Sequence, residues 1–386
     1  MGYVTAVNPP GKSRVTALVP TSRSVRRPVG RIALAVSALL LGVGATGAAV
    51  AADPVTTAGP PTAEPTTGAL PALRVSANYV AGISSGGYMA TQLQVAHSSR
   101  FAGAGIYSAG SYYCAEGSLA VALADCLPDT TPTRLGAYIK KTDEYAAAGK
   151  IDPTVNLARQ RTWAFHGTQD TTVVGPVADE LAAFYRHYGT LLTYRNTVAA
   201  GHAWVSPAGP VACGTTAPPY INTCSPDPLK DMLTTVLGGV KAPNTKTLKG
   251  TVTTVDQDRY AAPAAVGAGD PTRTGAHAIG MGKTGYLYTP ASCATSTCKL
   301  VVALHGCQQT AEQIGRTFVD RSYLNQYADT NGLVVLYPQA RPDETFGNPK
   351  GCWDWWGYLG AADGDYATKN GPQMRTIMNM VTALGR

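Results

Sequence analysis

The feature that most constrains the fold is a glycine–serine turn between a predicted strand and a predicted helix. Residues 77–83 (ANYVAGI) form a short apolar run suited to a buried strand, and residues 85–99 are predicted to be helical. Between them lies Gly82-Ile83-Ser84-Ser85-Gly86, a G-x-S-x-G pattern. In a nucleophile elbow the serine occupies a strained turn, and small residues two positions away on either side let strand and helix approach. Ser84 is therefore the candidate nucleophile, and a structural turn with an unreactive serine is the alternative.

Predicted strands and helices alternate from this turn as far as residue 239. Helix 175–189 illustrates the signal, because Pro176 lies near its start, Gly189 at its end, and apolar residues recur at helical spacing. Such alternation predicts a parallel sheet with helices on both faces. The other elements expected here are strands at 101–110, 161–170 and 193–200 and a helix at 227–239.

The pattern changes after residue 239. No internal repeat and no second low-complexity linker interrupts the chain, so we expect one large α/β domain over residues 71–386. Its remaining elements are predicted antiparallel strands at 250–260 and 285–293, buried strands at 299–307 and 333–339, and a helix at 371–386.

Residues 1–52 are predicted to be a secretory signal peptide. They contain six basic residues and no acidic one, then an apolar run, then the small-residue site Ala49-Val50-Ala51. The Arg26-Arg27 pair leaves twin-arginine export open, although its usual flanks are missing, and a membrane anchor is the alternative. Residues 53–70 are rich in Pro, Thr and Gly, as in a flexible leader. We therefore expect a secreted, extracellular protein.

The charge balance argues against a nucleic-acid partner. The chain has 31 Lys and Arg residues and 24 Asp and Glu residues, a formal charge of +7. Because six of the cations belong to the predicted signal peptide, the mature chain has 25 basic and 24 acidic residues. No basic stripe remains that could follow a phosphate backbone.

Eight cysteines in an exported chain predict four disulfide bonds. The sequence allows 105 pairings and does not fix one of them. The chain has no Cys-x-x-Cys pair and no Cys/His cluster with zinc spacing, so no metal site is expected. The most economical hypothesis joins neighbours along the chain: Cys114 with Cys126, Cys213 with Cys224, Cys293 with Cys298, and Cys307 with Cys352.

A nucleophilic serine needs a base, and the base needs an orienting carboxylate. Asp170 follows one predicted strand and His202 follows the next, so each lies in a loop at the carboxyl end of a strand. Asp179 and Asp125 are the rival carboxylates. We therefore assign Ser84 as nucleophile, Asp170 as orienting acid and His202 as base.

The other five histidines fit other roles. His97 lies late in a helix and His187 on a polar helix face, so both are expected to be solvated. His277 lies in a loop rich in Gly and Pro. His166 and His305 each precede a glycine at a strand end, where an imidazole can brace a turn.

The oxyanion hole indicates a circular permutation. One of its two amides normally comes from the residue after the nucleophile, and the other from a His-Gly loop that precedes the nucleophile strand. Here the sequence ALHGCQQ occurs at 303–309, long after Ser84. Joining Arg386 to the strand at 77 restores the usual order of oxyanion strand, helix, nucleophile strand, acid and base. The chain is predicted to be a circularly permuted α/β-hydrolase with a mostly parallel central sheet flanked by helices.

Five motifs in one order resemble the secreted, circularly permuted poly(3-hydroxybutyrate) depolymerases with a type 2 catalytic domain. The resemblance covers roughly residues 75–386 and implies an extracellular serine esterase that cleaves poly(3-hydroxybutyrate), or a related short-chain polyhydroxyalkanoate, through an acyl-enzyme without a cofactor. The motifs are GISSGGYMATQLQVAHSSRFAGAGIYSAGSYYC, FHGTQDTTV, GHAWV, LHGCQQT and NPKGCWDWWGY.

Carried over residue by residue, the resemblance implies the same catalytic set of Ser84, Asp170 and His202. It also implies that the backbone amides of Ser85 and Cys307 form the oxyanion hole.

The resemblance further implies that Trp353, in GCWDWWG, lines the pocket for the polymer, and we add Trp355 and Tyr112 to the substrate-binding set. Packing in the core is the alternative for each tryptophan. A Cys307–Cys352 bridge would tie the oxyanion loop to this wall.

Related non-permuted feruloyl or acetyl-xylan esterases share the HGC and GCW motifs and are the nearest alternative. A non-catalytic secreted binding protein on a hydrolase scaffold is a second alternative, against which the intact Ser/Asp/His set argues. The expected partner is an insoluble polyester, with no nucleic acid, no membrane after signal cleavage, and a monomeric protein. We expect no adsorption module after the catalytic domain, so polymer contact would require exposed aromatic side chains. The excess of 20 Tyr over 5 Phe favours an amphipathic rim.

Overall fold

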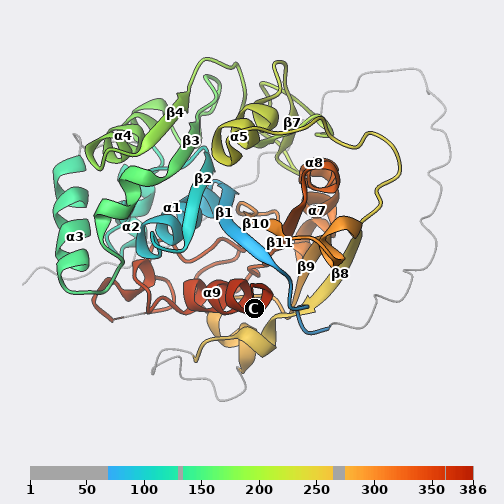
Figure 1. The fold of residues 1–386 in the computed structure, drawn as a ribbon. Helices are drawn as coiled ribbons and strands as arrows, with labels where there is room; N and C mark the ends of the chain where they lie inside the picture. Colours follow the sequence, from blue (N-terminus) through green and yellow to red (C-terminus); the bar gives the residue numbers. More distant parts are fainter. Residues whose placement is uncertain (1–67, 129–133, 264–273, 361, 386) are drawn as a thin grey trace, which may run out of the picture. The chain divides into compact units, whose positions relative to one another are not determined.

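The computed structural model describes residues 68–128, 134–263, 274–360 and 362–385. The predicted signal peptide and residues 53–67 of the predicted leader lie outside these ranges. An eight-stranded sheet carries the fold, in the order β4-β3-β2-β1-β10-β11-β9-β8 (Figure 1). Its strands are β1 (Val75–Ile83), β2 (Phe101–Tyr107), β3 (Arg161–Phe165), β4 (Leu191–Arg195), β8 (Thr251–Asp256), β9 (Thr284–Thr289), β10 (Cys298–Leu304) and β11 (Leu333–Tyr337).

The six neighbouring strands from β4 to β11 run parallel to one another. β9 lies antiparallel to β11, and β8 lies antiparallel to β9. Successive side chains of a strand point to opposite faces. On β1, Val80 belongs to one hydrophobic cluster, whereas Tyr79 and Ala81 belong to another. The predicted parallel sheet with two buried faces, and the antiparallel strands after residue 239, are therefore confirmed.

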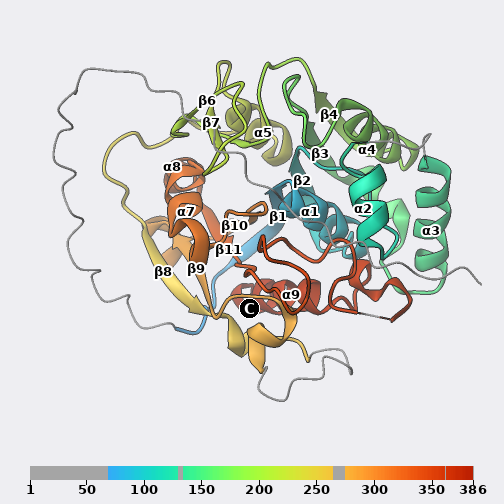
Figure 2. The same ribbon diagram turned by 180° about the vertical axis from the view of Figure 1, so that it is seen from behind.

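Helices cover both faces of the sheet. Buried side chains of α1, α4 and α9 join the first cluster, and those of α5, α7 and α8 join the second. Figure 2 shows α4 beside β4 and α8 beside β11. The helices are α1 (Ser85–Ala96), α2 (Leu119–Asp125), α3 (Leu135–Ala147), α4 (Gly175–His187), α5 (Pro228–Leu237), α6 (Ala311–Ile314), α7 (Thr317–Arg321), α8 (Leu324–Asn331) and α9 (Pro372–Leu384).

The last helix returns to the start of β1, as the permutation predicts (Figure 1). The carbonyl of Leu384 accepts a hydrogen bond of 2.8 Å from the amide of Leu73, two residues before β1 begins. β10 lies next to β1 in the sheet, although it comes more than half the chain later. The spatial sequence of oxyanion strand, closing helix and nucleophile strand is thus that of an α/β-hydrolase, with the chain opened between α9 and β1.

The loop that follows β4 is longer than expected. The strand predicted at 193–200 begins at Leu191 and ends at Arg195, so the following residues up to His202 form a loop. Three strands of two or three residues then form a small separate sheet in the order β5-β7-β6: β5 (Trp204–Val205), β6 (Val211–Ala212) and β7 (Ile221–Thr223). Strands this short carry no periodic signal, and they were not predicted.

The fold begins slightly before residue 71. The amide of Leu70 donates to the hydroxyl of Tyr260 at 2.7 Å, and the Leu70 side chain is buried. The Gly68 carbonyl accepts from the amide of Asp256 at 3.1 Å. The last three residues of the predicted leader therefore pack against the domain.

All eight cysteines form the four neighbour-to-neighbour disulfides: Cys114–Cys126, Cys213–Cys224, Cys293–Cys298 and Cys307–Cys352. The last closes a loop of 45 residues. In the chain-entropy model a loop of that length contributes about 4 kcal/mol to stability.

None of the helices in the described ranges is both long and apolar enough to span a bilayer.

Candidate active site

Ser84 occupies the sharp turn between β1 and α1. Its backbone has φ 55° and ψ −123°, a strained conformation for a residue with a side chain. The turn requires glycines, because a Cβ at Gly82 would collide with the Gly86 carbonyl. A Cβ at Gly86 would collide with the carbonyls at the end of β10. The G-x-S-x-G pattern therefore lets α1 lie close to both β1 and the HGC loop, the geometry of a nucleophile elbow.

Asp170 and His202 are brought together from two loops. His202 Nδ1 lies 2.8 Å from Asp170 Oδ2, and the other carboxylate oxygen accepts from the amides of Thr172 at 2.9 Å and Val173 at 3.0 Å. Burial alone raises the pKa of Asp170, but the hydrogen bonds from His202 and the Val173 amide outweigh it and leave the pKa below its ordinary value. An ionised carboxylate only accepts, so Nδ1 of His202 carries the proton and Nε2 is free to act as a base.

The rival groups are engaged elsewhere. Asp179 is exposed and accepts from the hydroxyl of Tyr194 at 2.8 Å. Asp125 pairs with Arg134, whose guanidinium lies 2.8 Å away.

Among the described residues, His202 is the only histidine in the wall of the cavity that Ser84 lines. His166 Nε2 lies 3.1 Å from the Val173 carbonyl and braces the loop after β3. His187 and His277 are exposed. The expectation that His97 is solvated is wrong, because the side chain is half-buried, and this desolvation lowers its pKa to about 4. Its Nε2 is buried and has no hydrogen-bond partner among the described residues.

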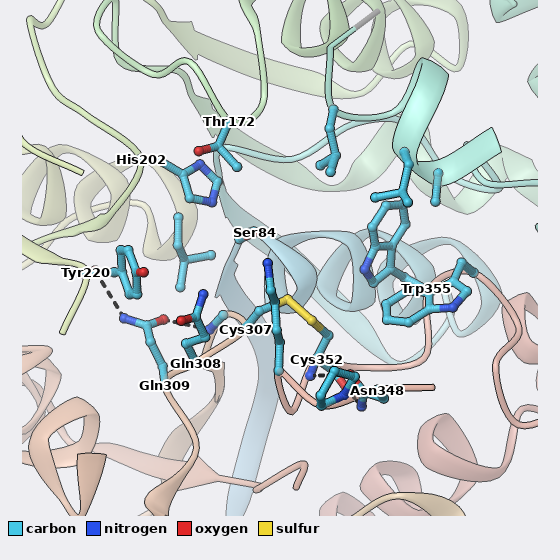
Figure 3. Close-up of a pocket in the computed structure, with 18 of the residues that line it drawn as sticks. Ser84, Thr172, His202, Tyr220, Cys307, Gln308, Gln309, Asn348, Cys352 and Trp355 are labelled. Carbon is cyan, nitrogen blue, oxygen red and sulfur yellow. Dashed lines mark hydrogen bonds between the residues drawn. A yellow bond between two sulfur atoms is a disulfide. The ribbon is translucent and has the colours of Figure 1, made fainter. Parts of the chain in front are cut away.

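Ser84 and His202 line one cavity of about 460 Å³ (Figure 3). Figure 3 shows Thr172 beside His202, and the Cys307–Cys352 disulfide crossing the floor below Ser84. The cavity walls come from three stretches of the chain, within 83–127, 172–220 and 306–356. Besides Ser84 and His202 they include Thr172, Tyr220, Cys307, Gln308, Gln309, Asn348, Trp355 and Trp356.

The two predicted oxyanion amides are available. Ser85 is the first residue of α1, and the amides of a first helical turn have no partner within the helix. In the HGC loop, the Gly306 amide donates to Gln309 Oε1 and the Gln308 amide to the Lys350 carbonyl, each at 2.7 Å. Across the described ranges, no acceptor is found for the intervening amide of Cys307. The geometry suits an oxyanion hole, and the catalytic roles themselves stay predictions.

Two members of the predicted substrate-binding set do not reach the cavity. Trp353 is fully buried, and its Nε1 donates to the His305 carbonyl at 3.0 Å. Tyr112 is also fully buried, and its hydroxyl donates to the Ala367 carbonyl at 2.6 Å. Both are core residues, and Trp353 holds the HGC loop from behind. Trp355 does line the cavity, stacked on Tyr88 with ring centroids 4.1 Å apart.

Residues that the sequence analysis missed line the cavity mouth. Leu119 and Leu123 on α2 are 47% and 56% exposed and belong to the cavity wall. The run SLAVALADC, closed by the Cys114–Cys126 disulfide, was the available signal. The expected rim of exposed tyrosines is wrong, because every tyrosine in the described ranges is buried or half-buried. The exposed apolar side chains at the mouth are leucines.

Comparisons with known proteins point to one family. The family model "Esterase PHB depolymerase" matches residues 284–382. A poly(3-hydroxybutyrate) depolymerase of Delftia acidovorans is 37% identical over 321 residues, which cover 81% of this chain and 60% of that protein. A polyhydroxybutyrate depolymerase of Talaromyces funiculosus is 35% identical over 337 residues, which cover 81% of this chain and 91% of that protein.

Solved structures agree with these relatives. The crystal structure of the PHB depolymerase from Penicillium funiculosum superposes with a TM-score of 0.71 at 32% identity, covering 82% of this chain and 99% of the other. A serine-to-alanine variant of a PHB depolymerase, complexed with an R3HB trimer, gives a TM-score of 0.72 with the same identity and coverage. The chain spans 60% of the length of the Delftia relative and nearly all of the solved ones. With its permuted sheet, its serine elbow and its Asp–His pair, the chain belongs to the poly(3-hydroxybutyrate) depolymerase family.

Proposed function

We propose that the protein is a serine esterase that hydrolyses the ester bonds of poly(3-hydroxybutyrate) or a related short-chain polyhydroxyalkanoate. The observation that carries the proposal is the convergence of Ser84 and His202 on one cavity, with Asp170 held 2.8 Å from His202. Poly(3-hydroxybutyrate) is proposed as the substrate because both relatives are depolymerases of this polymer. The solved PHB depolymerase complex holds a trimer of the R3HB unit.

The reaction follows from the groups present. Ser84 Oγ attacks the ester carbonyl carbon while His202 Nε2 takes its proton, and Asp170 stabilises the imidazolium. The amides of Ser85 and Cys307 stabilise the negative charge on the carbonyl oxygen. The ester C–O bond breaks, the His202 imidazolium gives its proton to the leaving alkoxide oxygen to release an alcohol, and an acyl-enzyme remains on Ser84. A water molecule, deprotonated by His202, then releases the free carboxylic acid and regenerates the serine.

The walls of the cavity suit an aliphatic polyester. Trp355 and Trp356 supply flat apolar surface on one side, and the two leucines of α2 supply an exposed apolar mouth. An insoluble polymer presents a surface rather than a single molecule, so apolar side chains outside the catalytic pocket add contact area. Feruloyl and acetyl-xylan esterases remain the alternative within serine esterases, but no relative reported above carries such a name.

The test is a clearing assay. The wild-type protein is expected to clear a suspension of poly(3-hydroxybutyrate) and to release 3-hydroxybutyrate oligomers, with weak activity on feruloyl and acetyl-xylan esters. Ser84→Ala serves as the blank. A protein that cleaves feruloyl or acetyl esters and leaves the polymer suspension turbid would overturn the substrate assignment while keeping the esterase.

We also infer that the protein is exported and acts as a monomer on the polymer, without nucleic acid or membrane. The basic and apolar segment in residues 1–52 supports export, and four disulfides fit an oxidising compartment. Two measurements check the inference: the N-terminal residue of protein recovered from culture medium, expected to be Asp53, and the molar mass in solution, expected to be that of one chain.

A further inference from the structure

The peptide unit between Gly306 and Cys307 is fixed from behind. In a trans peptide the carbonyl and the amide point in opposite directions. His305 Nδ1 lies 2.7 Å from the Gly306 carbonyl, and His305 Nε2 lies 3.1 Å from the amide of Ala340. Because that amide can only donate, Nε2 accepts and Nδ1 carries the proton. The imidazole therefore holds the carbonyl on one side of the loop and leaves the Cys307 amide on the other.

The state of the imidazole suits this task. His305 is fully buried, and desolvation lowers its pKa to about 4, which the hydrogen bond to the Gly306 carbonyl only partly opposes. The ring is therefore neutral at the pH of most enzyme assays and keeps one donor and one acceptor. Both are used, since one end of the ring holds the HGC loop and the other holds Ala340, just beyond β11.

Gln309 holds the preceding peptide unit and links it to a distant loop. Its Oε1 accepts from the Gly306 amide at 2.7 Å. Its Nε2 donates to the Pro219 carbonyl at 2.8 Å. It also donates to the Tyr220 carbonyl at 3.0 Å, a hydrogen bond drawn in Figure 3. The Tyr220 carbonyl also accepts from the amide of Trp204. The buried side chain of Gln309 thus links the HGC loop to the segment that pairs with β5. β5 itself begins two residues after His202.

We propose that His305 and Gln309 are positioning residues that aim the Cys307 amide at the oxyanion and set its distance from the base. The inference rests on the proposed function, because an oxyanion hole matters only if Ser84 forms an acyl-enzyme. About a hundred residues separate His202 from the HGC loop in sequence, and Gln309 links that loop to Tyr220, whose carbonyl also accepts from the amide of Trp204, two residues after His202.

Replacing Gln309 by methionine keeps the volume and removes all three hydrogen bonds. Removing a whole oxyanion donor costs about 10²–10³ in kcat. Misplacing one is expected to cost less, so Gln309→Met should lower kcat by about 10- to 100-fold on a soluble butyrate ester, with KM within twofold. His305→Phe keeps a ring but loses both nitrogens, and it is expected to show the same loss of kcat with a nearly unchanged KM.

A structural defect is separated from a positioning defect by a matched control and by a transition-state mimic. Gln160 is as buried as Gln309, donates to the Ser98 carbonyl at 2.7 Å and accepts from Gln94 at 2.7 Å, far from the cavity. Gln160→Met is expected to lower the melting temperature and leave kcat within twofold. Butaneboronic acid forms a tetrahedral adduct with a catalytic serine, so its inhibition constant should rise with Gln309→Met in proportion to the loss of kcat/KM.

A Gln309→Met enzyme with kcat and boronate inhibition within twofold of wild type would overturn the proposal, as would an equal loss of kcat in Gln160→Met. If Gln309→Met does not fold, Gln309→Glu, which keeps the acceptor for the Gly306 amide and loses the donor, is expected to give the same kcat loss. Ser84→Ala separates this proposal from the function itself. Activity that survives Ser84→Ala refutes the esterase site. If Ser84→Ala is inactive and Gln309→Met has normal activity, only the positioning role of Gln309 is refuted.

Discussion

The leucines at the cavity mouth are predicted to hold the enzyme on its insoluble substrate. Leu119 and Leu123 lie on α2 and are 47% and 56% exposed, an uncommon arrangement for two leucines on one turn of a helix. Replacing both by serine keeps the backbone and removes the apolar surface. We expect adsorption to polymer particles to weaken while turnover of a soluble ester falls far less.

The magnitude follows from the exposed fractions. Burying a whole leucine side chain contributes about 1.5–3 kcal/mol. Because about half of each side chain is already covered, docking on a polymer surface can bury the other half, worth about 0.7–1.5 kcal/mol per leucine. The two together amount to about 1.5–3 kcal/mol, or about 10- to 150-fold in adsorption.

The assay is an adsorption isotherm on poly(3-hydroxybutyrate) granules, measured in a Ser84→Ala background so that the polymer is not consumed. Leu191→Ser on β4 is the matched control, since Leu191 is 56% exposed and lies outside the cavity wall. The double variant should bind at least tenfold more weakly than the control. Equal binding of the double variant and the Leu191→Ser control would refute the role of α2.

Asp170→Asn should leave the fold intact and favour the wrong tautomer of His202. By analogy with the serine-protease triad, kcat on a soluble ester should fall by about 10⁴-fold. A near-normal rate would assign the orienting role to another carboxylate. Trp355→Ala should lower activity on long oligomers by about thirtyfold, the equivalent of about 2 kcal/mol of lost contact, and should lower activity on an acetyl ester much less. Trp353→Ala should lower both activities together and cost about 3–5 kcal/mol of stability. Measuring both activities and the melting temperature of each variant tests these two roles. Burial raises the pKa of Asp354 to about 7, against the hydrogen bonds from the Tyr358 and Gly357 amides, so the native state favours the protonated carboxyl. Stability should therefore fall as pH rises from about 4, where the unfolded carboxyl ionises, to about 7, and Asp354→Asn should flatten that part of the melting-temperature profile; an unchanged slope would contradict the assignment.

The fold was predictable because its signals are local and repeated. β1, the elbow and α1 form a continuous pattern in the sequence, and each glycine of that pattern has a steric reason in the structure. The neighbour-to-neighbour disulfides followed from chain economy, since three of the four close loops of 12 residues or fewer. The permutation could be inferred because the HGC motif occurs in the wrong place for an unpermuted hydrolase.

The substrate wall was not predictable in the same way. Trp353 and Trp355 are two residues apart in an irregular segment, where no period assigns one to the core and the other to the cavity. Only packing decides: Trp353 donates to the His305 carbonyl, whereas Trp355 stacks on Tyr88 at the cavity. The role of Gln309 was equally hidden, because the two carbonyls to which it donates lie about 90 residues away in sequence. Short strands such as β5 form only through such distant contacts.

The central claim, that Ser84 is the nucleophile of an esterase, is tested most directly by covalent labelling. An organophosphonate ester that mimics a tetrahedral acyl adduct should label the protein once per chain, and peptide mapping by mass spectrometry should place the label on Ser84. Labelling and hydrolysis of a soluble butyrate ester should be lost in parallel, and Ser84→Ala should take up no label and retain less than about one part in 10⁴ of the activity. A label on another residue, or a Ser84→Ala protein that retains a tenth of the wild-type activity, would contradict the account.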